Sequence, residues 1–543
     1  MAWTRRAFGL TALAAGCASA PRGEDVIITG GPIYSGGGRV EAVRIRDGRF
    51  VFVGALADAR VGGPAREIDL GGAAAFPGFC DSHVHLVGVG MAAMVLDLVG
   101  VASIAALQQQ LRAYAVAHPD GPIIGRGWIE THWPERRFPT RADIDAVVSD
   151  RPVFLERIDG HAAVANTAAL TLGQIGESTP DPGGGRIERD ASGAATGMLI
   201  DNATALVQSR LPAPTPAMRR EALRQAAQIY AARGWTGVAN MSTSGEEAML
   251  FLEFATNQAL PLHADIYLTP EASDPLFVRG PFGMGRAHVR GVKLYMDGAL
   301  GSRGAALLAP YNDAAGSGLL VTPAEEVARF ARRARERGVQ VAAHAIGDRG
   351  NRLVLDAYRD AFADNPTALR AARWRIEHAQ VLAPGDIPRF AGMGVIASMQ
   401  PSHAISDMHF APARLGEARL GGAYAWASLL RSGATIAAGS DAPVEKGDPL
   451  IEFYAACHRH DLNGFAGPNW RLDEAVSRAQ ALAMLTSAGA YAAFSENERG
   501  DIAVGKRADL SCFSVDLMTC APEEIPRARA VLTICEGEVT HAS

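Results

Sequence analysis

Short apolar runs alternate with amphipathic stretches through the middle of the chain, and this alternation constrains the fold more than any other feature. Strands that alternate with helices build parallel sheets from βα units. A closed barrel of such units has eight strands. The chain has nine candidate runs, so one of them must lie outside the barrel. The sequence therefore predicts an α/β fold with a (β/α)8 TIM barrel. The nine candidate runs are Ala73–Cys80, Val153–Leu155, Thr236–Asn240, His263–Leu268, Gly291–Tyr295, Val339–Ala343, Arg373–Glu377, Val395–Met399 and Thr435–Ala438.

Both ends of the chain are rich in strand patterns instead. Asp25–Thr29, Ala42–Arg46 and Arg49–Val53 are apolar or alternate, and Asp47-Gly48 is typical of a hairpin turn. Leu510–Ser514 and Ala530–Ile534 have the same character. We predict that residues 24–72 and 500–541 form one small β-sandwich, which leaves residues 73–499 to the barrel domain. Residues 121–211 have weak barrel periodicity, and we expect an insertion over the barrel mouth.

The first 20 residues have the pattern of an export signal, which is excluded from the fold. Thr4-Arg5-Arg6 is a twin-arginine pattern, and the apolar run that follows is too short to span a bilayer. Leu13–Cys17 resembles a bacterial lipobox, in which Cys17 would be acylated. Cleavage after Ala20 is the alternative, although Pro21 disfavours it. The prediction is a protein exported by the twin-arginine pathway to the periplasm or cell envelope and lipid-anchored at Cys17.

Composition excludes several classes of partner. The formal net charge of −6 gives no basic footprint for nucleic acid. Six cysteines without close spacing in 543 residues do not indicate a disulfide framework or a zinc ribbon. A small-molecule substrate, membrane contact through the lipid anchor only, and a homo-oligomer are all compatible with this composition.

Potential metal ligands follow five of the predicted barrel strands. His83 and His85 end the first run, and alternate residues of a strand share a face. In a TIM barrel the C-terminal ends of the strands meet at one mouth, where catalytic groups lie. Imidazole and carboxylate are common ligands of zinc-type ions. The candidate metal ligands are His83, His85, Lys293, His344, His378 and Asp441.

The chain resembles the amidohydrolase superfamily, and within it the family 3 branch, metal-dependent hydrolases similar to N-substituted formamide deformylase. The resemblance covers nearly the whole chain after the export signal. It is specific for fold and metal chemistry and uninformative about substrate. The matching stretches are Pro77–His85, Asp159–His161 with Asn166, Lys293–Arg303, His344–Asp348, Glu377–Ala379, Gln400–His403, Gly439–Glu445 and Gly505–Leu510.

The resemblance implies a role for each ligand. His83, His85 and Asp441 would hold one divalent ion, most simply Zn²⁺, and His344 and His378 a second. Lys293 would be carboxylated and bridge the two; an unmodified Lys293 beside a single ion is the alternative. The implied mechanism is attack of metal-bound hydroxide on a carbon–nitrogen bond other than a peptide bond, in an amide or an N-acyl or N-formyl amine, with Asp441 as the proton shuttle. Alternatives are an esterase or lactonase with the same site and a non-catalytic binding or regulatory lipoprotein.

Five further residues are candidates for substrate binding, each with a structural alternative. His161 follows Asp159-Gly160 in the insertion, and His403 follows a predicted strand. Asp297 and Arg303 lie just beyond the Lys293 strand and could orient an oxygen-bearing substrate or pair with each other. Trp128 could line the pocket or pack inside the insertion.

Overall fold

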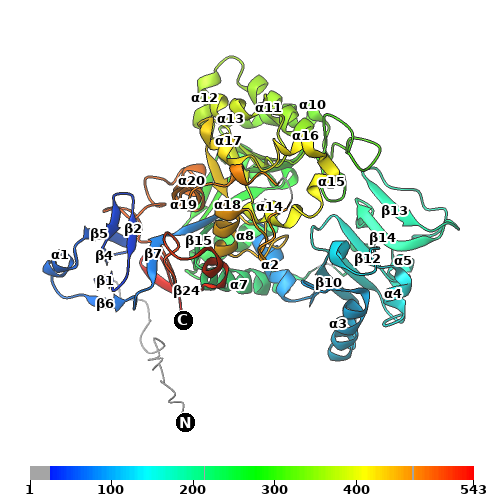
Figure 1. The fold of residues 1–543 in the computed structure, drawn as a ribbon, viewed down its shortest axis with the longest axis horizontal. Helices are drawn as coiled ribbons and strands as arrows, with labels where there is room; N and C mark the ends of the chain where they lie inside the picture. The colour runs from blue at the N-terminus through cyan, green and yellow to red at the C-terminus, as the bar shows by residue number, and fades with distance from the viewer. Residues whose placement is uncertain (1–24, 213, 468–469) are drawn as a thin grey trace, which may run out of the picture.

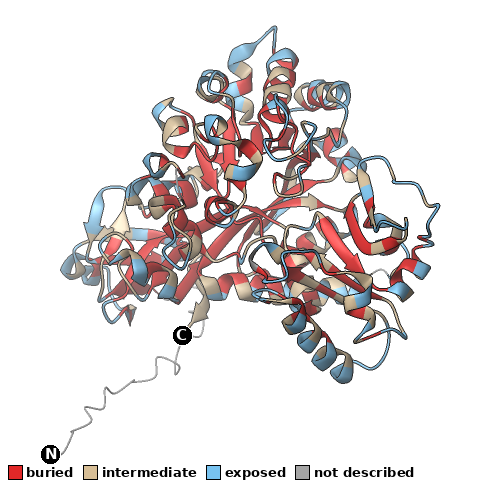
Figure 2. Cartoon of the chain, turned by 45° about the vertical axis from the view of Figure 1, so that its right-hand side comes forward, coloured by how far each residue is buried: buried red, intermediate tan, exposed pale blue. Residues whose placement is uncertain are grey.

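A computed structural model describes residues 25–212, 214–467 and 470–543. Three parts are visible in Figure 1: a barrel with helices around it, a β-sandwich beside the N-terminal end, and a separate sheet with helices on the opposite side. The buried residues run continuously through the barrel and sandwich, as Figure 2 shows. The predicted α/β fold with a TIM barrel is confirmed.

The barrel consists of eight parallel strands in sequence order. An isolated parallel bridge between Val84 and Ala442 joins the last strand region to the first and closes the sheet. Nearly every residue of these strands is buried, as expected when helices cover a parallel sheet. The strands are β8 (Phe79–Val84), β15 (Trp235–Thr243), β16 (His263–Leu268), β18 (Ala287–Tyr295), β19 (Gln340–Ala345), β20 (Arg375–His378), β21 (Ile396–Met399) and β22 (Ile436–Ala438), and the short β17 (Phe282–Met284) pairs with β18.

Helices follow the strands and cover the barrel. Residues on either side cap the long α7. The side chain of Thr215, before its first turn, accepts the backbone amide of Met218, and Gly234, after its last turn, is in the left-handed region. The helices of this part are α2 (Leu86–Ala93), α7 (Pro216–Arg233), α8 (Gly245–Thr256), α9 (Asp274–Arg279), α10 (Ala324–Glu336), α11 (Asp348–Ala361), α12 (Pro366–Ala372), α13 (Ile387–Met393), α14 (Pro401–Asp407), α15 (Ala411–Leu415), α16 (Glu417–Leu420), α17 (Trp426–Arg431), α18 (Pro449–His458), α19 (Arg478–Leu485) and α20 (Ser487–Ala492).

The sandwich combines strands from both ends of the chain. One sheet has the order β5-β4-β1-β6 and the other β25-β24-β23-β7-β2-β3. Apolar side chains from both sheets, Ile28 and Ile534 among them, form one core. The elements are β1 (Val26–Thr29), β2 (Ile33–Ser35), β3 (Gly38–Val40), β4 (Ala42–Arg46), β5 (Arg49–Gly54), α1 (Leu56–Val61), β6 (Arg66–Asp69), β7 (Ala74–Pro77), β23 (Leu510–Phe513), β24 (Ala530–Cys535) and β25 (Glu538–Ala542).

The first predicted barrel run, Ala73–Cys80, is two strands rather than one. β7 pairs with β23 in the sandwich, and β8 pairs with β15 in the barrel. Gly78 separates them, and a Cβ there would lie 2.2 Å from the hydroxyl oxygen of Thr236. The chain therefore passes from one domain to the other at a point with no room for a side chain.

The insertion is a folded unit with a six-stranded sheet of order β13-β14-β12-β11-β10-β9. It starts at Leu96, earlier than the predicted residue 121, because α3 packs in the same core as β10 and β11. The predicted run Val153–Leu155 belongs to this sheet and is the ninth, non-barrel run. Its elements are β9 (Leu96–Asp97), α3 (Ile104–Ala117), β10 (Ile123–Trp128), α4 (Arg141–Asp145), β11 (Val153–Arg157), β12 (Ala162–Ala165), α5 (Thr167–Leu172), β13 (Gly185–Arg189), β14 (Ala195–Asp201) and α6 (Ala205–Gln208).

The predicted export signal, residues 1–20 with Cys17, lies outside the described residues. In the part of the chain that the structure describes, no helix has both the length and the apolar character needed to cross a membrane.

Candidate metal centre

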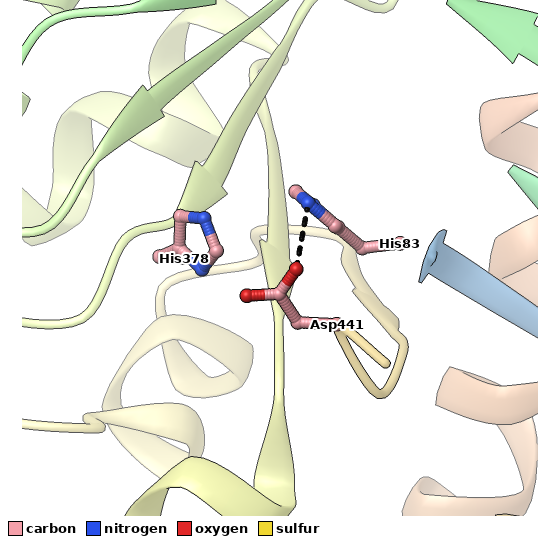
Figure 3. Close-up of side chains that lie close together, drawn as sticks. All are labelled: His83, His378 and Asp441. Carbon is pink, nitrogen blue, oxygen red and sulfur yellow. Dashed lines mark ion pairs between the residues drawn. The ribbon is translucent and has the colours of Figure 1, made fainter. Parts of the chain in front are cut away.

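The ends of five barrel strands bring the six predicted ligands to one cavity. Potential ligand atoms of His83, His378 and Asp441 all lie within 4.8 Å of one another, and all three residues are buried. Figure 3 shows the carboxylate of Asp441 facing His83, with His378 beside them. Imidazole nitrogens and a carboxylate oxygen at such separations are a donor set that suits zinc-type ions.

Asp441 lies between the first two histidines. Its Oδ1 is 3.3 Å from Nε2 of His83 and 3.2 Å from Nε2 of His85. The backbone amide of Asp441 donates to the carbonyl of His83 at 2.7 Å. This hydrogen bond holds Asp441 in the left-handed region, with φ of 59°. Burial raises the pKa of Asp441, but His83 and the other nearby histidines outweigh it and lower the pKa well below its ordinary value. The residue therefore presents an ionised carboxylate to both histidines.

A carboxylate that sequence reasoning missed fixes the orientation of His83. Glu377 Oε2 lies 2.6 Å from Nδ1 of His83, and Arg375 binds the same carboxylate through Nε at 2.8 Å and Nη2 at 3.0 Å. Burial raises the pKa of Glu377, but Arg375 outweighs it and lowers the pKa below its ordinary value. An ionised Glu377 can only accept, so Nδ1 of His83 carries the proton and Nε2 keeps its lone pair. The sequence did contain a signal for Glu377. Arg375 and Glu377 are opposite charges at alternate positions of a buried strand, so they share a face and must pair.

The other histidines of the cluster are held in a related way. Nδ1 of His378 lies 2.8 Å from Oε1 of Gln400, which leaves its Nε2 available. His344 packs against His378 with ring centroids 4.5 Å apart, and its buried Nε2 has no hydrogen-bond partner among the described residues. Burial lowers the pKa of both residues well below the ordinary value, so both imidazoles are neutral. Neutral imidazole is the form that binds a metal ion.

Lys293 is a buried amine inside this cluster. Its Nζ lies 3.4 Å from Nε2 of His83, and no carboxylate of the described residues forms an ion pair with it. Burial lowers the pKa of Lys293 to about 8, against the opposing effect of Glu377 and Asp441. The amine is therefore still mostly protonated at pH 7, but its neutral form is far more accessible than that of an exposed lysine.

Asp81 joins the first and last strands below the ligands. Its carboxylate accepts the backbone amide of Ser440 at 2.9 Å, the Ser440 hydroxyl at 2.6 Å and the backbone amide of His83 at 3.1 Å. The hydroxyl of Tyr230 adds a fourth donor at 3.1 Å. The barrel therefore closes through hydrogen bonds beside the residues that form the cluster.

The cluster opens into a cavity of about 390 Å³. Ile129, Arg157 and Asp159 of the insertion line one wall, and Ile405 and Phe410 of the segment after β21 line another. The insertion thus contributes directly to the walls around the candidate centre.

Two of the five substrate-binding candidates line this cavity. His161 does so, with Nδ1 2.8 Å from Oδ1 of Asp201. Burial lowers the pKa of His161, but Asp201 and Asp159 outweigh it and raise the pKa above its ordinary value. His403 also lines the cavity; its Nε2 lies 3.7 Å from Oδ2 of Asp441 and has no hydrogen-bond partner among the described residues.

The other three candidates lie outside the cavity lining. Asp297 is fully buried and accepts the backbone amides of Ala306, Ile346 and Gly347, and its Oδ1 lies 3.6 Å from Nε2 of His344, so it organises loops behind the cluster. Arg303 pairs with Asp313 at 2.9 Å, not with Asp297 as the alternative supposed. Trp128 packs in the core of the insertion and donates to the carbonyl of Leu155. Asp297 and Arg303 thus lie outside the predicted substrate site because loop contacts satisfy their side chains, whereas Trp128 has the alternative placement, inside the insertion.

Comparison with known proteins decides the family. The sequence model of the amidohydrolase family matches residues 66–541. The chain belongs to the amidohydrolase family. It is 34% identical over 529 residues to YtcJ of Bacillus subtilis (strain 168), provisionally named an amidohydrolase, with 94% of this chain and 98% of that protein covered. Membership in this family makes the chain a hydrolase.

Two further comparisons support this assignment. The chain is 29% identical to the N-substituted formamide deformylase of Arthrobacter pascens over 531 residues, which cover 92% of this chain and 94% of that enzyme. Its fold is similar to that of an uncharacterized metal-dependent hydrolase from Pyrococcus horikoshii OT3, with a TM-score of 0.75, 28% identity, and 92% and 99% of the two chains covered. Both comparisons span this amidohydrolase almost completely, the sandwich and the insertion included.

Proposed function

We propose that this amidohydrolase cleaves a carbon–nitrogen bond other than a peptide bond, in an amide or an N-acyl or N-formyl amine, with one or two divalent ions, most simply Zn²⁺. The observation that supports the proposal is the convergence of His83, His378 and Asp441 donor atoms within 4.8 Å at the bottom of a cavity. The name of the similar deformylase favours nitrogen over oxygen as the leaving atom.

The residues present fit a metal ion. His83 and His378 are neutral, their Nδ1 atoms are engaged by Glu377 and Gln400, and their Nε2 atoms are left as donors. His83, His85 and Asp441 would hold one ion, and His344 and His378 a second. When bound, a divalent ion lowers the pKa of a coordinated water towards about 7 and polarises the scissile carbonyl.

Lys293 would serve the centre as a carbamate. Its amine would attack carbon dioxide, form a nitrogen–carbon bond and release a proton, which gives an anionic oxygen donor. The buried position of Lys293, 3.4 Å from Nε2 of His83, supports this proposal because it places the carbamate among the candidate ligands.

Asp441 would move the proton of the reaction. Its carboxylate would accept a proton from the attacking water and deliver it to the leaving nitrogen, a role that needs an ionised group beside the reacting atoms. The lowered pKa of Asp441 supplies that ionised form. His403 and His161 would orient the substrate from the cavity wall.

The test is turnover by the purified full chain loaded with zinc or manganese, on N-formyl and N-acyl amines and on aryl esters. We expect amide hydrolysis, lowered at least about 100-fold in Asp441→Asn, with bound metal measured in parallel. Glu336→Gln, an exposed change on α10, is the matched control. Hydrolysis of esters alone, or undiminished amide turnover in Asp441→Asn, would contradict the proposal.

We also propose export by the twin-arginine pathway and lipid attachment at Cys17. The support is the pattern Thr4-Arg5-Arg6 followed by an apolar run and the lipobox-like Leu13–Cys17. Incorporation of labelled fatty acid into the native chain, lost in Cys17→Ser, is the expected result. Equal labelling of both chains would contradict lipid attachment at this residue.

A further inference from the structure

Apart from the candidate ligands and the other histidines, the charged side chains that line the cavity are mostly acidic. They are Arg157, Asp159, Asp407 and Glu445. Arg157 already pairs with Asp159 and, through Nε at 2.8 Å, with Glu130. The guanidinium is therefore neutralised by protein carboxylates and is unsuited to bind an anionic substrate.

Glu445 and Asp407 have no basic partner within ion-pair distance among the described residues. Glu445 accepts the hydroxyl of Ser406 at 2.7 Å. Asp407 accepts the hydroxyl of Tyr424 and, at 2.7 Å, the amide of Gln380. Burial raises the pKa of Glu445 to about 7 and that of Asp407 to about 6, as expected for carboxylates without a cation. A cation at this wall would stabilise both ionised forms.

A smaller cavity of about 150 Å³ adjoins this wall and shares Ile405, Ser406 and Glu445 with the main one. We call it the acidic annex, because its lining includes Asp448, Glu452 and Asp461 as well as Glu445, against the single basic residue Lys446. Ser402 also lines the annex, and its buried hydroxyl has no hydrogen-bond partner among the described residues. Asp461 already pairs with His409, and burial raises the pKa of Glu452 well above its ordinary value. The annex thus offers room, the carboxyl groups of Glu445 and Asp448 and an unused polar group next to the main cavity.

We infer that the substrate is an amide that bears a cationic amine, which binds at Glu445 and Asp407 and extends towards the acidic annex. This inference rests on the proposed function and names its substrate class. A group with an ammonium would gain two carboxylate partners, whereas a carboxylate at Glu445 and Asp407 would meet like charges. The wall would therefore select by charge, while the apolar residues Ile405 and Phe410 contact the connecting carbon chain.

Three formamides of equal length separate charge from size: monoformyl diaminobutane, N-pentylformamide and formamidopentanoate. With the metal-loaded enzyme, we expect kcat/KM for the cationic compound to exceed that for the neutral one at least about 10-fold, and the anionic compound to be the poorest. In Glu445→Gln, which keeps the shape and the hydrogen bond from Ser406, the preference should fall at least about 10-fold, mainly through KM. The control Glu336→Gln should keep the preference for the cationic compound.

Equal kcat/KM for the three compounds, or a loss in Glu445→Gln that is the same for all three, would overturn the inference while leaving amide hydrolysis intact. A second measurement does not depend on turnover. Pentylamine, which is an ammonium ion at neutral pH, should bind the metal-loaded wild type at least about 10-fold more tightly than the neutral pentan-1-ol, and Glu445→Gln should remove the difference. Failure to hydrolyse any formamide together with this binding preference would contradict the proposed reaction alone, whereas equal binding of the amine and the alcohol would contradict the cation site.

Discussion

Glu377 shows how one buried residue prepares the candidate centre without facing the cavity. It binds Nδ1 of His83 on one side and the guanidinium of Arg375 on the other, and all three side chains are buried. Arg375 also donates to the carbonyl of Ser82 and, at 2.7 Å, to the hydroxyl of Ser398. The charge of Arg375 thus keeps Glu377 ionised, and Glu377 keeps the lone pair of His83 on Nε2.

Glu377→Gln should weaken metal binding about 10- to 100-fold, because a neutral amide no longer favours the Nδ1–H form of His83. Zinc affinity, measured by competition with a chelator, is the readout, and the absorption spectrum of the cobalt-loaded protein reports the ligand geometry. The matched control is Glu496→Gln, which removes a partner of Arg373; Arg373 lies before the start of β20, at the opposite end of that strand from His378. It should lower stability without changing zinc affinity. Equal zinc affinity in wild type and Glu377→Gln would exclude the positioning role.

The residues that the sequence identified well are those at strand ends. His83, His85, Lys293, His344, His378 and Asp441 all line one cavity, since their place after a strand could be read from apolar patterns. Their roles as ligands stay predictions. Asp297 and Arg303 were misplaced because the backbone amides around Asp297 and the partner Asp313 come from loops, whose paths have no periodicity in the sequence.

At the scale of elements, the join between β8 and β22 determines whether the ligands meet. The two strand ends approach so closely that Gly439 has no space for a side chain: an added Cβ would lie 2.4 Å from the amide nitrogen of His83 and 2.7 Å from Oδ1 of Asp81. Backbone and a buried carboxylate cannot yield as a flexible side chain could. Glycine is therefore required here for close approach.

Gly439→Ala should destabilise the fold by about 1 to 3 kcal/mol, as overpacking does, and should weaken zinc binding because it separates Asp441 from His83. Thermal unfolding and chelator competition measure the two effects. Gly392→Ala in α13 is the control, since nothing lies within 4 Å of its added Cβ, and it should be neutral or slightly stabilising. A Gly439→Ala protein as stable as the control would show that the strand ends can separate freely.

Strands were the most predictable elements, because buried parallel strands are short and continuously apolar. The misread run Ala73–Cys80 and the run Val153–Leu155, which proved to be the one outside the barrel, have the same explanation. β7 and β11 have that apolar character too, but they belong to the sandwich and the insertion sheet. A run of buried residues indicates a strand, whereas the sheet that it joins depends on pairing with distant partners such as β23, which local pattern does not encode.

At the scale of the whole molecule, the sandwich is attached to the barrel by buried polar contacts. His263, at the start of β16, has its Nε2 3.0 Å from Oδ2 of Asp509, just before β23. The other oxygen of Asp509 accepts the backbone amide of Glu536 at 2.8 Å. Cys535 lies in the same cluster, but burial raises the pKa of its thiol well above the ordinary value. These contacts connect the C-terminal strands to the barrel.

Asp509→Asn should lower the free energy of unfolding by about 2 kcal/mol near pH 5. Burial raises the pKa of Asp509, but His263 outweighs it and lowers the pKa to about 2 from 3.8, and a tenfold change in the acid dissociation constant corresponds to about 1.4 kcal/mol. Because the folded-state pKa is the lower one, this stabilisation is complete above the unfolded-state value and is lost as the pH falls towards 2. In urea unfolding, the difference between wild type and Asp509→Asn should therefore be large near pH 5 and shrink near pH 3. Asp120→Asn, an exposed carboxylate change before β10, should show no such difference. A difference that grows between about pH 5 and pH 3 would mean that the carboxylate of Asp509 is not held ionised by His263.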